Sequence, residues 1–165
     1  MNIKPQNTHE LTKLGELIED MSVAMLTTFE EEEGLLMNRP MSPREMCEQG
    51  AIWFLTDPHS NKVKHLQVMN LGFPNESDSN YVSISGHGEI VDNRARIESL
   101  WTVFAKPWFP VGEDSSNLAL LKFVPHSAEV WDAPNSKMVR MLAMAASIVA
   151  ATPIGMGENG NLKAL

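Results

Sequence analysis

The chain has 165 residues, of which 43% are hydrophobic and 21% are charged, a composition typical of a single globular domain. Its 21 Asp and Glu outnumber its 13 Lys and Arg, and the resulting net charge of -8 disfavours binding to nucleic acid or to an anionic membrane. Cys47 is the only cysteine, so we expect no internal disulfide and a cytoplasmic location. We also expect no signal peptide and no membrane span, because no apolar run is long enough.

The first half of the chain predicts a helix and then several short strands. The helix covers residues 9–20, where apolar residues recur at helical spacing and Thr8 is placed to cap the first turn. Segments rich in β-branched and apolar residues predict strands at 22–29, 35–41, 51–56 and 68–73. The glutamates at 30–33 predict a solvated hairpin tip. Pro40 predicts an edge position or a bulge, since proline cannot donate to a strand ladder.

The second half predicts a long strand, a helix, two more strands and a C-terminal helix. Residues 81–91 alternate like a strand, and two glycines within them favour a bend or a barrel corner. The later elements are a helix from 93 to about 104, an aromatic loop at 106–112, strands at 118–124 and 128–131, a helix at 137–150 and an irregular tail. This pattern predicts one α+β domain over residues 1–165, built around an antiparallel barrel at about 22–132.

The most informative segment for function runs from Thr56 to Lys62. It follows a predicted strand and begins a predicted helix, so free backbone N–H groups and the positive end of a helix dipole are expected there. The side chains of Thr56, Ser60, Asn61 and Lys62 add further donors and one full positive charge. Such a set suits a phosphate monoester. By residue chemistry alone, however, a capped helix with Lys62 at the surface is the simpler interpretation.

Arg39 and the tryptophans add two weaker indications of a ligand site. Arg39 precedes Pro40 and Met41 on a strand that proline forces out of regular pairing, so a ligand could reach it; an ordinary edge-strand arginine is the alternative. Four tryptophans against one tyrosine is a high ratio, which would suit stacking on a planar aromatic ligand. Trp53 and Trp101 are better explained as core or interface residues.

Several familiar site motifs are absent from the sequence. The glycines around His87 do not form a dinucleotide fingerprint, because no third glycine follows and no helix begins there. The five histidines are scattered without metal-ligand spacing, so we expect no metal site. Cys47 has no local partner and is interpreted as a passive thiol.

Short motifs recur in a fixed order along the chain. They are residues 24–28 (AMLTT), 39–41 (RPM), 53–57 (WFLTD) with Ser60 and Lys62, 81–86 (YVSISG), 108–112 (WFPVG), 118–123 (LALLKF) and 128–132 (AEVWD). In this order they resemble the flavin-binding split barrels of the pyridoxamine 5'-phosphate oxidase-like superfamily, and within it the general stress protein branch. The resemblance covers roughly residues 10–135, with a weaker match at 157–159.

The resemblance implies a six-stranded antiparallel Greek-key split β-barrel with flanking helices. It also implies a homodimer that binds FMN in two clefts between the subunits. The residues it assigns to the flavin phosphate are Thr56, Ser60, Asn61 and Lys62, with Asn61 in the place of an arginine of the oxidases. The other cofactor-binding residues it implies are Arg39, Pro40, Met41, Phe54, Tyr81, Trp108 and Trp131. Tyr81 replaces a glutamine that touches the ring system, and Trp131 belongs to the closing Glu-x-Trp strand.

Two departures from the oxidases change the expected function. The lysine that follows their arginine is absent after Arg39, and Arg44 is the candidate substitute. After Trp131, residues 132–137 replace the arginine–histidine segment that handles the vitamin substrate. We therefore expect bound FMN but no oxidation of pyridoxamine 5'-phosphate.

The function expected from the sequence is that of an FMN-binding protein of the general stress type. It would act as a flavin-dependent oxidoreductase on an unknown substrate, and no catalytic residue is assigned. The alternatives are a non-catalytic flavin carrier and a split barrel that binds deazaflavin or haem instead of FMN.

Overall fold

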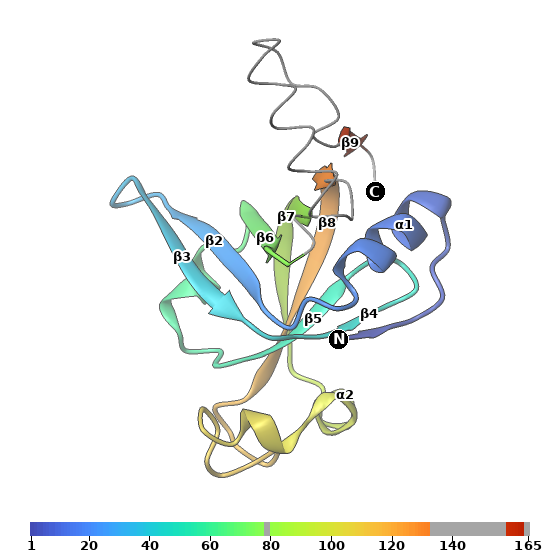
Figure 1. The fold of residues 1–165 in the computed structure, drawn as a ribbon. Helices are drawn as coiled ribbons and strands as arrows, with labels where there is room; N and C mark the ends of the chain where they lie inside the picture. Colours follow the sequence, from blue (N-terminus) through green and yellow to red (C-terminus); the bar gives the residue numbers. More distant parts are fainter. Residues whose placement is uncertain (78–79, 133–157, 164–165) are drawn as a thin grey trace.

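The computed structural model describes residues 1–77, 80–132 and 158–163. Within these residues the chain forms one nine-stranded sheet with two α-helices and two 3₁₀ turns (Figure 1). The predicted α+β class is therefore confirmed. The predicted helix at 137–150 lies outside the described residues. No helix in the described ranges is long and apolar enough to cross a membrane.

The sheet is built from nine strands of the described residues. They are β1 (Asn2–Ile3), β2 (Ala24–Glu30), β3 (Leu35–Met41), β4 (Pro43–Met46), β5 (Ile52–Thr56), β6 (Met69–Asn75), β7 (Asn80–Val91), β8 (Ala119–Asp132) and β9 (Glu158–Lys163). The helices are α1 (His9–Ile18) and α2 (Arg94–Leu100), and the 3₁₀ turns are η1 (Asn61–Lys64) and η2 (Val103–Ala105). The strand order is β1-β4-β5-β8-β7-β6-β2-β3, with β9 also paired to β8. Every described pairing is antiparallel except that of β1 with β4.

Ser42 connects the end strand β3 to β4, the strand next to the opposite end of the sheet. It is the only residue between β3, which pairs with β2, and β4, which pairs with β5. One stretch of backbone thus runs from one end of the strand order to the strand next to the other end, and Figure 1 shows β3 leading directly into β4. Along Leu35–Met41 the strand pairs with β2 alone, as the proline in this strand predicted.

The main core fills the space between the sheet and α1. Thr8 caps α1 by accepting a hydrogen bond from the Leu11 backbone N–H, as its position predicted. Leu14 and Ile18 of α1 are fully buried against inward-facing residues such as Leu26 and Ile84. Each such side chain contributes about 1.5–3 kcal/mol through removal of its apolar surface from water. This packing holds β2, and therefore the hairpin that β2 begins, in a fixed position.

A second apolar cluster lies outside the main core, where α2 covers β5 and the start of β8. Ile97 and Leu100 of α2 are buried there together with Leu118 and Leu120. Trp53 and Trp101 are half-buried against this cluster, and the Arg96 guanidinium lies 5.1 Å from the Trp53 ring centroid. The interpretation of these two tryptophans as packing residues is consistent with this arrangement.

Two predicted helices are shorter than expected. The segment after β5 forms only the four-residue turn η1. The Leu66 carbonyl accepts a hydrogen bond from the Gly88 N–H at 2.8 Å, so it is not available as an acceptor within a longer helix. The helix predicted to extend to about 104 ends at Leu100, since Trp101 adopts an extended conformation.

Two predicted boundaries in the strands are also wrong. The two strands expected at 118–124 and 128–131 are one continuous strand, β8. Pro125 and the polar residues after it suggested a break, but the ladder absorbs them as a bulge in which Pro125 lies opposite Gly86 and His126 is the extra residue. The tail expected to be irregular includes β9, which pairs with β8.

Candidate functional site

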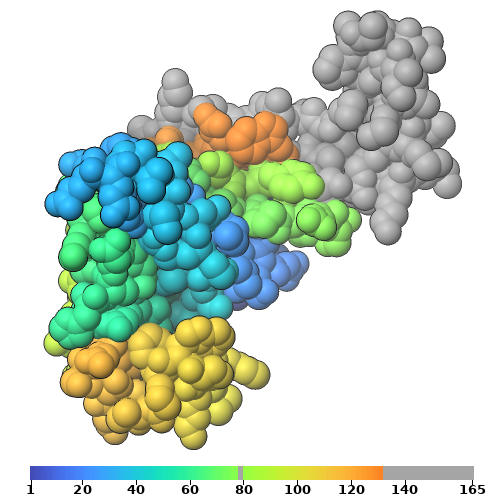
Figure 2. Space-filling model, turned by 90° about the vertical axis from the view of Figure 1, so that its left-hand side faces the viewer, coloured from blue at the N-terminus to red at the C-terminus, as the bar shows by residue number. Residues whose placement is uncertain are grey.

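The candidate site lies where the edge strand β3 meets the segment that follows β5. Arg39 lies opposite Leu26, whose side chain is fully buried, so Arg39 is on the inner face of the β2–β3 hairpin. Residues 57–68 connect β5 to β6 and approach the same hairpin. Figure 2 shows the hairpin (blue and cyan) against the segment that follows β5 (green) on one face of the molecule.

Arg39 is held by two side chains of β2. One guanidinium nitrogen, Nη1, donates a hydrogen bond to Thr28 Oγ1 at 3.0 Å, and the other, Nη2, lies 3.8 Å from Glu30 Oε1. Thr28 is fully buried, and Glu30 is only 6% exposed. Arg39 is therefore fixed at the inner face while part of its surface remains accessible.

The turn after β5 brings three donor side chains next to this arginine. Asn61 Nδ2 donates to the same Glu30 Oε1 at 3.1 Å. Lys62 Nζ donates to Ser60 Oγ at 2.8 Å, and Ser60 Oγ in turn donates to the Asp57 carbonyl at 2.7 Å. The segment is thus ordered by local hydrogen bonds instead of by a helix. The helix dipole expected from the sequence is not present, because η1 is a single 3₁₀ turn.

Lys62 and Arg39 are close enough for their charges to interact. The pKa of the Lys62 ammonium is lowered below its ordinary value, first by burial and then by the positive charge of Arg39, while Asp57 acts in the opposite direction. Two neighbouring cations in a partly desolvated place attract an anion, and in the protein alone the carboxylates of Glu30 and Asp57 partly fill that role. A phosphate between them would remove the repulsion and compensate for the desolvation.

The Thr56 hydroxyl is an independent indication that a hydrogen-bonding ligand binds near the end of β5. Thr56 is only 2% exposed, and its Oγ1 has no hydrogen-bond partner within the part of the chain that the structure describes. A buried hydroxyl without a partner costs about 1–3 kcal/mol, so such groups are normally satisfied. The hydroxyl is a suitable donor to an oxygen of a phosphate. The donor set at this place therefore fits a phosphate-bearing cofactor.

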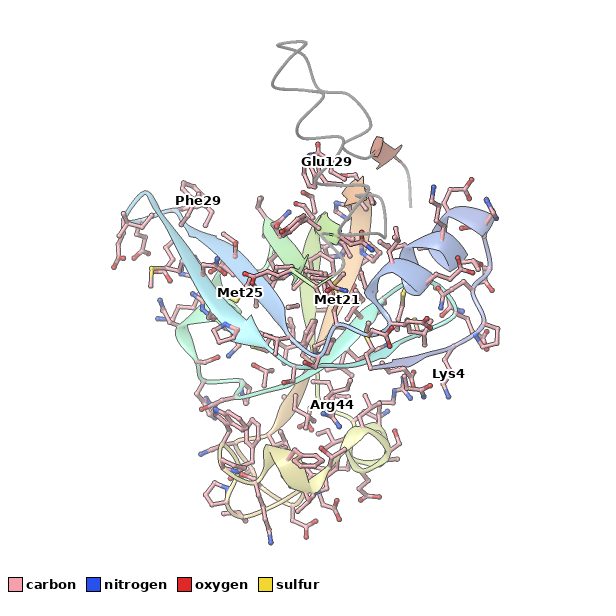
Figure 3. All side chains as sticks on the ribbon, viewed as in Figure 1. Lys4, Met21, Met25, Phe29, Arg44 and Glu129 are labelled. Carbon is pink, nitrogen blue, oxygen red and sulfur yellow. The ribbon has the colours of Figure 1, made fainter. Side chains whose placement is uncertain are left out.

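Of the other residues implied by the resemblance, two pack in or against the main core. The Phe54 side chain is fully buried in the main core, and Met41 packs against that core from its edge. Pro40 is exposed and lies on the opposite face of β3 from Arg39. Arg44 does not replace the missing lysine of the oxidases, because its Nε donates to the Leu100 carbonyl at 3.2 Å, close to α2 (Figure 3).

Besides Phe54, the resemblance implies three aromatic residues, and these do not meet in one place. Tyr81 and Trp131 lie opposite one another on β7 and β8, and are 42% and 40% exposed. Trp108, 75% exposed, belongs to the loop between η2 and β8. This loop leads into the start of β8 (Figure 1), whereas Trp131 lies near the end of the same strand. The strand between the loop and Trp131 is roughly 40 Å long. The aromatic residues at the two ends cannot contact the same ring within one subunit.

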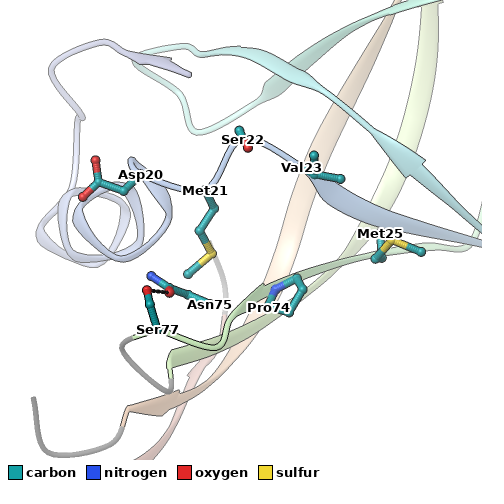
Figure 4. Close-up of a pocket in the computed structure, with 8 residues that line it drawn as sticks. All are labelled: Asp20, Met21, Ser22, Val23, Met25, Pro74, Asn75 and Ser77. Carbon is teal, nitrogen blue, oxygen red and sulfur yellow. Dashed lines mark hydrogen bonds between the residues drawn. The ribbon is translucent and has the colours of Figure 1, made fainter. Parts of the chain in front are cut away.

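A shallow groove of ≈ 310 Å³ lies on the outer side of the sheet. Figure 4 shows its lining, which comes from the segment between α1 and β2 and from the end of β6: Asp20, Met21, Ser22, Val23, Met25, Pro74, Asn75 and Ser77. Its lining contains one carboxylate and no cationic side chain. The groove is therefore unsuited to a phosphate, but its apolar side chains continue through Pro74 toward Tyr81 and Trp131 by strand pairing.

The structure also brings together residues that the sequence analysis treated separately. Glu30 was interpreted as part of a solvated tip, although it shares the inner face of β2 with Leu26 and Thr28. The period of two within β2 could have revealed this. The His87 Nδ1 lies 2.8 Å from the His126 Nε2, since the bulge in β8 places both rings on one face. Among the described residues, no group of three or more His, Cys, Asp and Glu could hold a metal ion.

The family of the chain follows from a comparison with protein-family models. The model described as pyridoxamine 5'-phosphate oxidase like matches residues 9–153. The chain belongs to this family. The resemblance found in the short motifs is thereby confirmed. The comparison with curated proteins gives no match.

Solved structures share the fold of this family member. A protein assigned as general stress protein 26 from Jannaschia sp. CCS1 is 24% identical, with a TM-score of 0.71 over 94% of this chain and 96% of that chain. A protein related to general stress protein 26 from Clostridium acetobutylicum is 20% identical, with a TM-score of 0.67 over the same shares. The general stress FMN/FAD binding protein from Xanthomonas citri is 26% identical, with a TM-score of 0.64 over 79% of this chain and 92% of that chain.

Removing the charge of Lys62 should stabilise the protein without ligand. Because the pKa of Lys62 is lowered in the folded state, its charged form opposes folding, and solvent screening keeps the effect below about 1 kcal/mol. Lys62→Met should therefore raise the free energy of unfolding in urea at pH 7. The difference from wild type should shrink as the pH rises through the window just below 10.5, where the wild-type protein regains this stability.

Lys64→Met is the matched control, since Lys64 is an exposed lysine of the same turn. Its free energy of unfolding should stay within about 0.5 kcal/mol of wild type. A loss of stability in Lys62→Met that exceeds the change in this control would contradict the assignment of Lys62 as a desolvated cation.

Proposed function

We propose that the protein binds FMN and that Arg39 and Lys62 hold its phosphate from two sides. The observation that carries this proposal is the pair of interacting cations, together with the buried, unpartnered Thr56 hydroxyl at the end of β5. Membership in the pyridoxamine 5'-phosphate oxidase-like family supports it. So does the likeness to the general stress FMN/FAD binding protein from Xanthomonas citri, which is named for a flavin ligand.

Each residue of the cradle has a distinct role in this proposal. Arg39 and Lys62 supply the positive charge that a dianionic phosphate needs when it leaves water. Asn61 and Thr56 supply neutral donors that fix its orientation, and Ser60 joins them by exchanging its hydrogen bond to the Asp57 carbonyl for one to the phosphate. Bound FMN would supply electron and hydride transfer chemistry, which no side chain of the protein can provide.

The ring of the flavin requires more surface than one subunit offers near the cradle. Large apolar side chains are exposed in the loop after α2, namely Val103, Phe104, Trp108 and Val111. We propose that a second copy of the chain covers this loop, so that the cofactor cleft is made by two subunits. This places Trp108 of one subunit and Trp131 of the other within reach of one ligand. The six-stranded Greek-key split barrel of the family is part of the same proposal, and the direct connection from the end strand β3 to β4 through Ser42 supports it.

The proposed reaction is specified by its class alone. A flavin-dependent oxidoreductase with an unassigned substrate is the favoured function, and a flavin carrier is the alternative. Oxidation of pyridoxamine 5'-phosphate is not expected, because residues 132–137 lack the arginine–histidine segment. The cytoplasmic location expected from the cysteine usage stays a prediction. Reoxidation of the reduced nicotinamide cofactor by the flavin-loaded protein would distinguish an enzyme from a carrier.

The phosphate contact can be tested by comparing FMN with riboflavin, which has the same ring and no phosphate. Removing one partner of a desolvated charge pair costs about 2–5 kcal/mol, so Lys62→Met should weaken FMN binding by roughly 30-fold or more. Riboflavin binding should change far less. Flavin fluorescence titration measures both affinities, and Lys64→Met serves as the control. Equal weakening of both ligands, or of neither, would refute the assignment of the cradle. A protein that binds deazaflavin or haem in preference to FMN would support the alternative cofactors.

The proposed dimer can be tested by light scattering in solution. The protein should have about twice the 18.3 kDa mass of one chain at micromolar concentration, since two-fold dimers are the commonest closed assemblies. Trp108→Glu should reduce this mass and weaken binding of both FMN and riboflavin, because it puts a charge into an apolar interface. Lys13→Glu, at an exposed position of α1 outside this loop, should leave the mass unchanged. A wild-type monomer that binds FMN tightly would contradict the shared cleft.

A further inference from the structure

A buried carboxylate lies inside the proposed phosphate cradle. Glu30 Oε1 accepts a hydrogen bond from Asn61 Nδ2 at 3.1 Å and lies 3.8 Å from Arg39 Nη2. The residues that follow Glu30 at the hairpin tip, 31–33, are exposed. One glutamate of the acidic run therefore has surroundings that the other three lack.

The hairpin fixes Glu30 in this position. The alternation of β2 places Glu30 on the inner face together with Thr28, and its backbone carbonyl accepts hydrogen bonds from the N–H groups of Glu33 and Gly34 in the turn. Gly34 has a positive φ of 66°, which favours glycine and closes the turn at this residue. The backbone of Glu30 is therefore fixed with its side chain on the inner face, and the contacts with Asn61 and Arg39 orient the carboxylate.

The charges at the cradle balance before any ligand binds. Arg39 and Lys62 carry two positive charges, and Glu30 and Asp57 carry two negative charges. Glu30 also uses the donors that a phosphate needs, because a single oxygen of its carboxylate faces both Asn61 and Arg39. At 3.8 Å its pairing with Arg39 is longer than a charge-assisted hydrogen bond, so the arginine can exchange it for a better acceptor.

We propose that Glu30 is an internal competitor that limits the affinity of the cradle for a phosphate group and keeps the bound ligand exchangeable. This inference rests on the proposed function. A phosphate that enters the cradle takes Arg39 and Asn61 from Glu30 and is repelled by the carboxylate that remains beside it. The affinity for FMN then depends on how much more strongly Arg39 and Asn61 bind the phosphate than the Glu30 carboxylate. Glu30 therefore affects binding of the phosphate and not of the flavin ring.

The test is Glu30→Gln, which removes the charge but keeps the shape and an oxygen that can accept from Asn61. FMN binding should become tighter by roughly tenfold, because a like charge beside the phosphate is removed. Riboflavin binding should stay within about twofold of wild type, since riboflavin has no phosphate. Glu31→Gln is the matched control, because it makes the same change of charge at an exposed position of the same hairpin. It should change FMN affinity by less than about twofold.

The outcomes separate this inference from the proposed function. Wild-type protein that binds FMN, combined with Glu30→Gln that binds it equally or more weakly, overturns the inference alone and makes Glu30 a residue that positions Arg39. Wild-type protein that does not discriminate FMN from riboflavin overturns the proposed function and this inference together. If Glu30→Gln does not fold, Glu30→Met must show the same tightening of FMN binding. Tightening by Glu31→Gln to the same extent would also overturn the inference, because it would show a general charge effect.

Discussion

The burial of the Lys62 ammonium beside Arg39 is the constraint on which the account of this site depends. Both side chains are partly removed from water, and they approach one another from separate parts of the chain, the edge strand β3 and the turn after β5. The fold holds this arrangement through packing elsewhere, since α1 and the main core fix β2 and therefore the hairpin. A site that is unfavourable for the protein alone is an expected property of a binding site for an anion.

Much of the fold could be predicted because its signals are local. Helix α1 is marked by apolar residues at helical spacing and by its Thr8 cap. The edge position of β3 is marked by a proline within the strand itself. Features that depend on distant partners could not be predicted. The helix expected after β5 is replaced by a turn because Gly88 of β7 engages the Leu66 carbonyl, and β8 runs through Pro125 because the ladder with β7 accommodates a bulge there.

The candidate site shows the same division between local and distant signals. The segment from Thr56 to Lys62 was identified from its donors alone, and its proximity to Arg39 was expected only from the family resemblance. The involvement of Glu30 required the register of the hairpin, because four consecutive glutamates look alike in the sequence and only one faces inward. The separation of Trp108 from Trp131 along β8 likewise emerges only in three dimensions, and it makes a second subunit part of the proposal.

A crystal structure of the protein with FMN tests the central claim most directly. We expect phosphate oxygens within about 2.7–2.9 Å of both Lys62 Nζ and an Arg39 Nη, the range of charge-assisted hydrogen bonds. The Thr56 hydroxyl should gain a partner in the same complex. A phosphate bound elsewhere, for example at the groove beside Met21, with Arg39 still turned toward Glu30, would contradict the account.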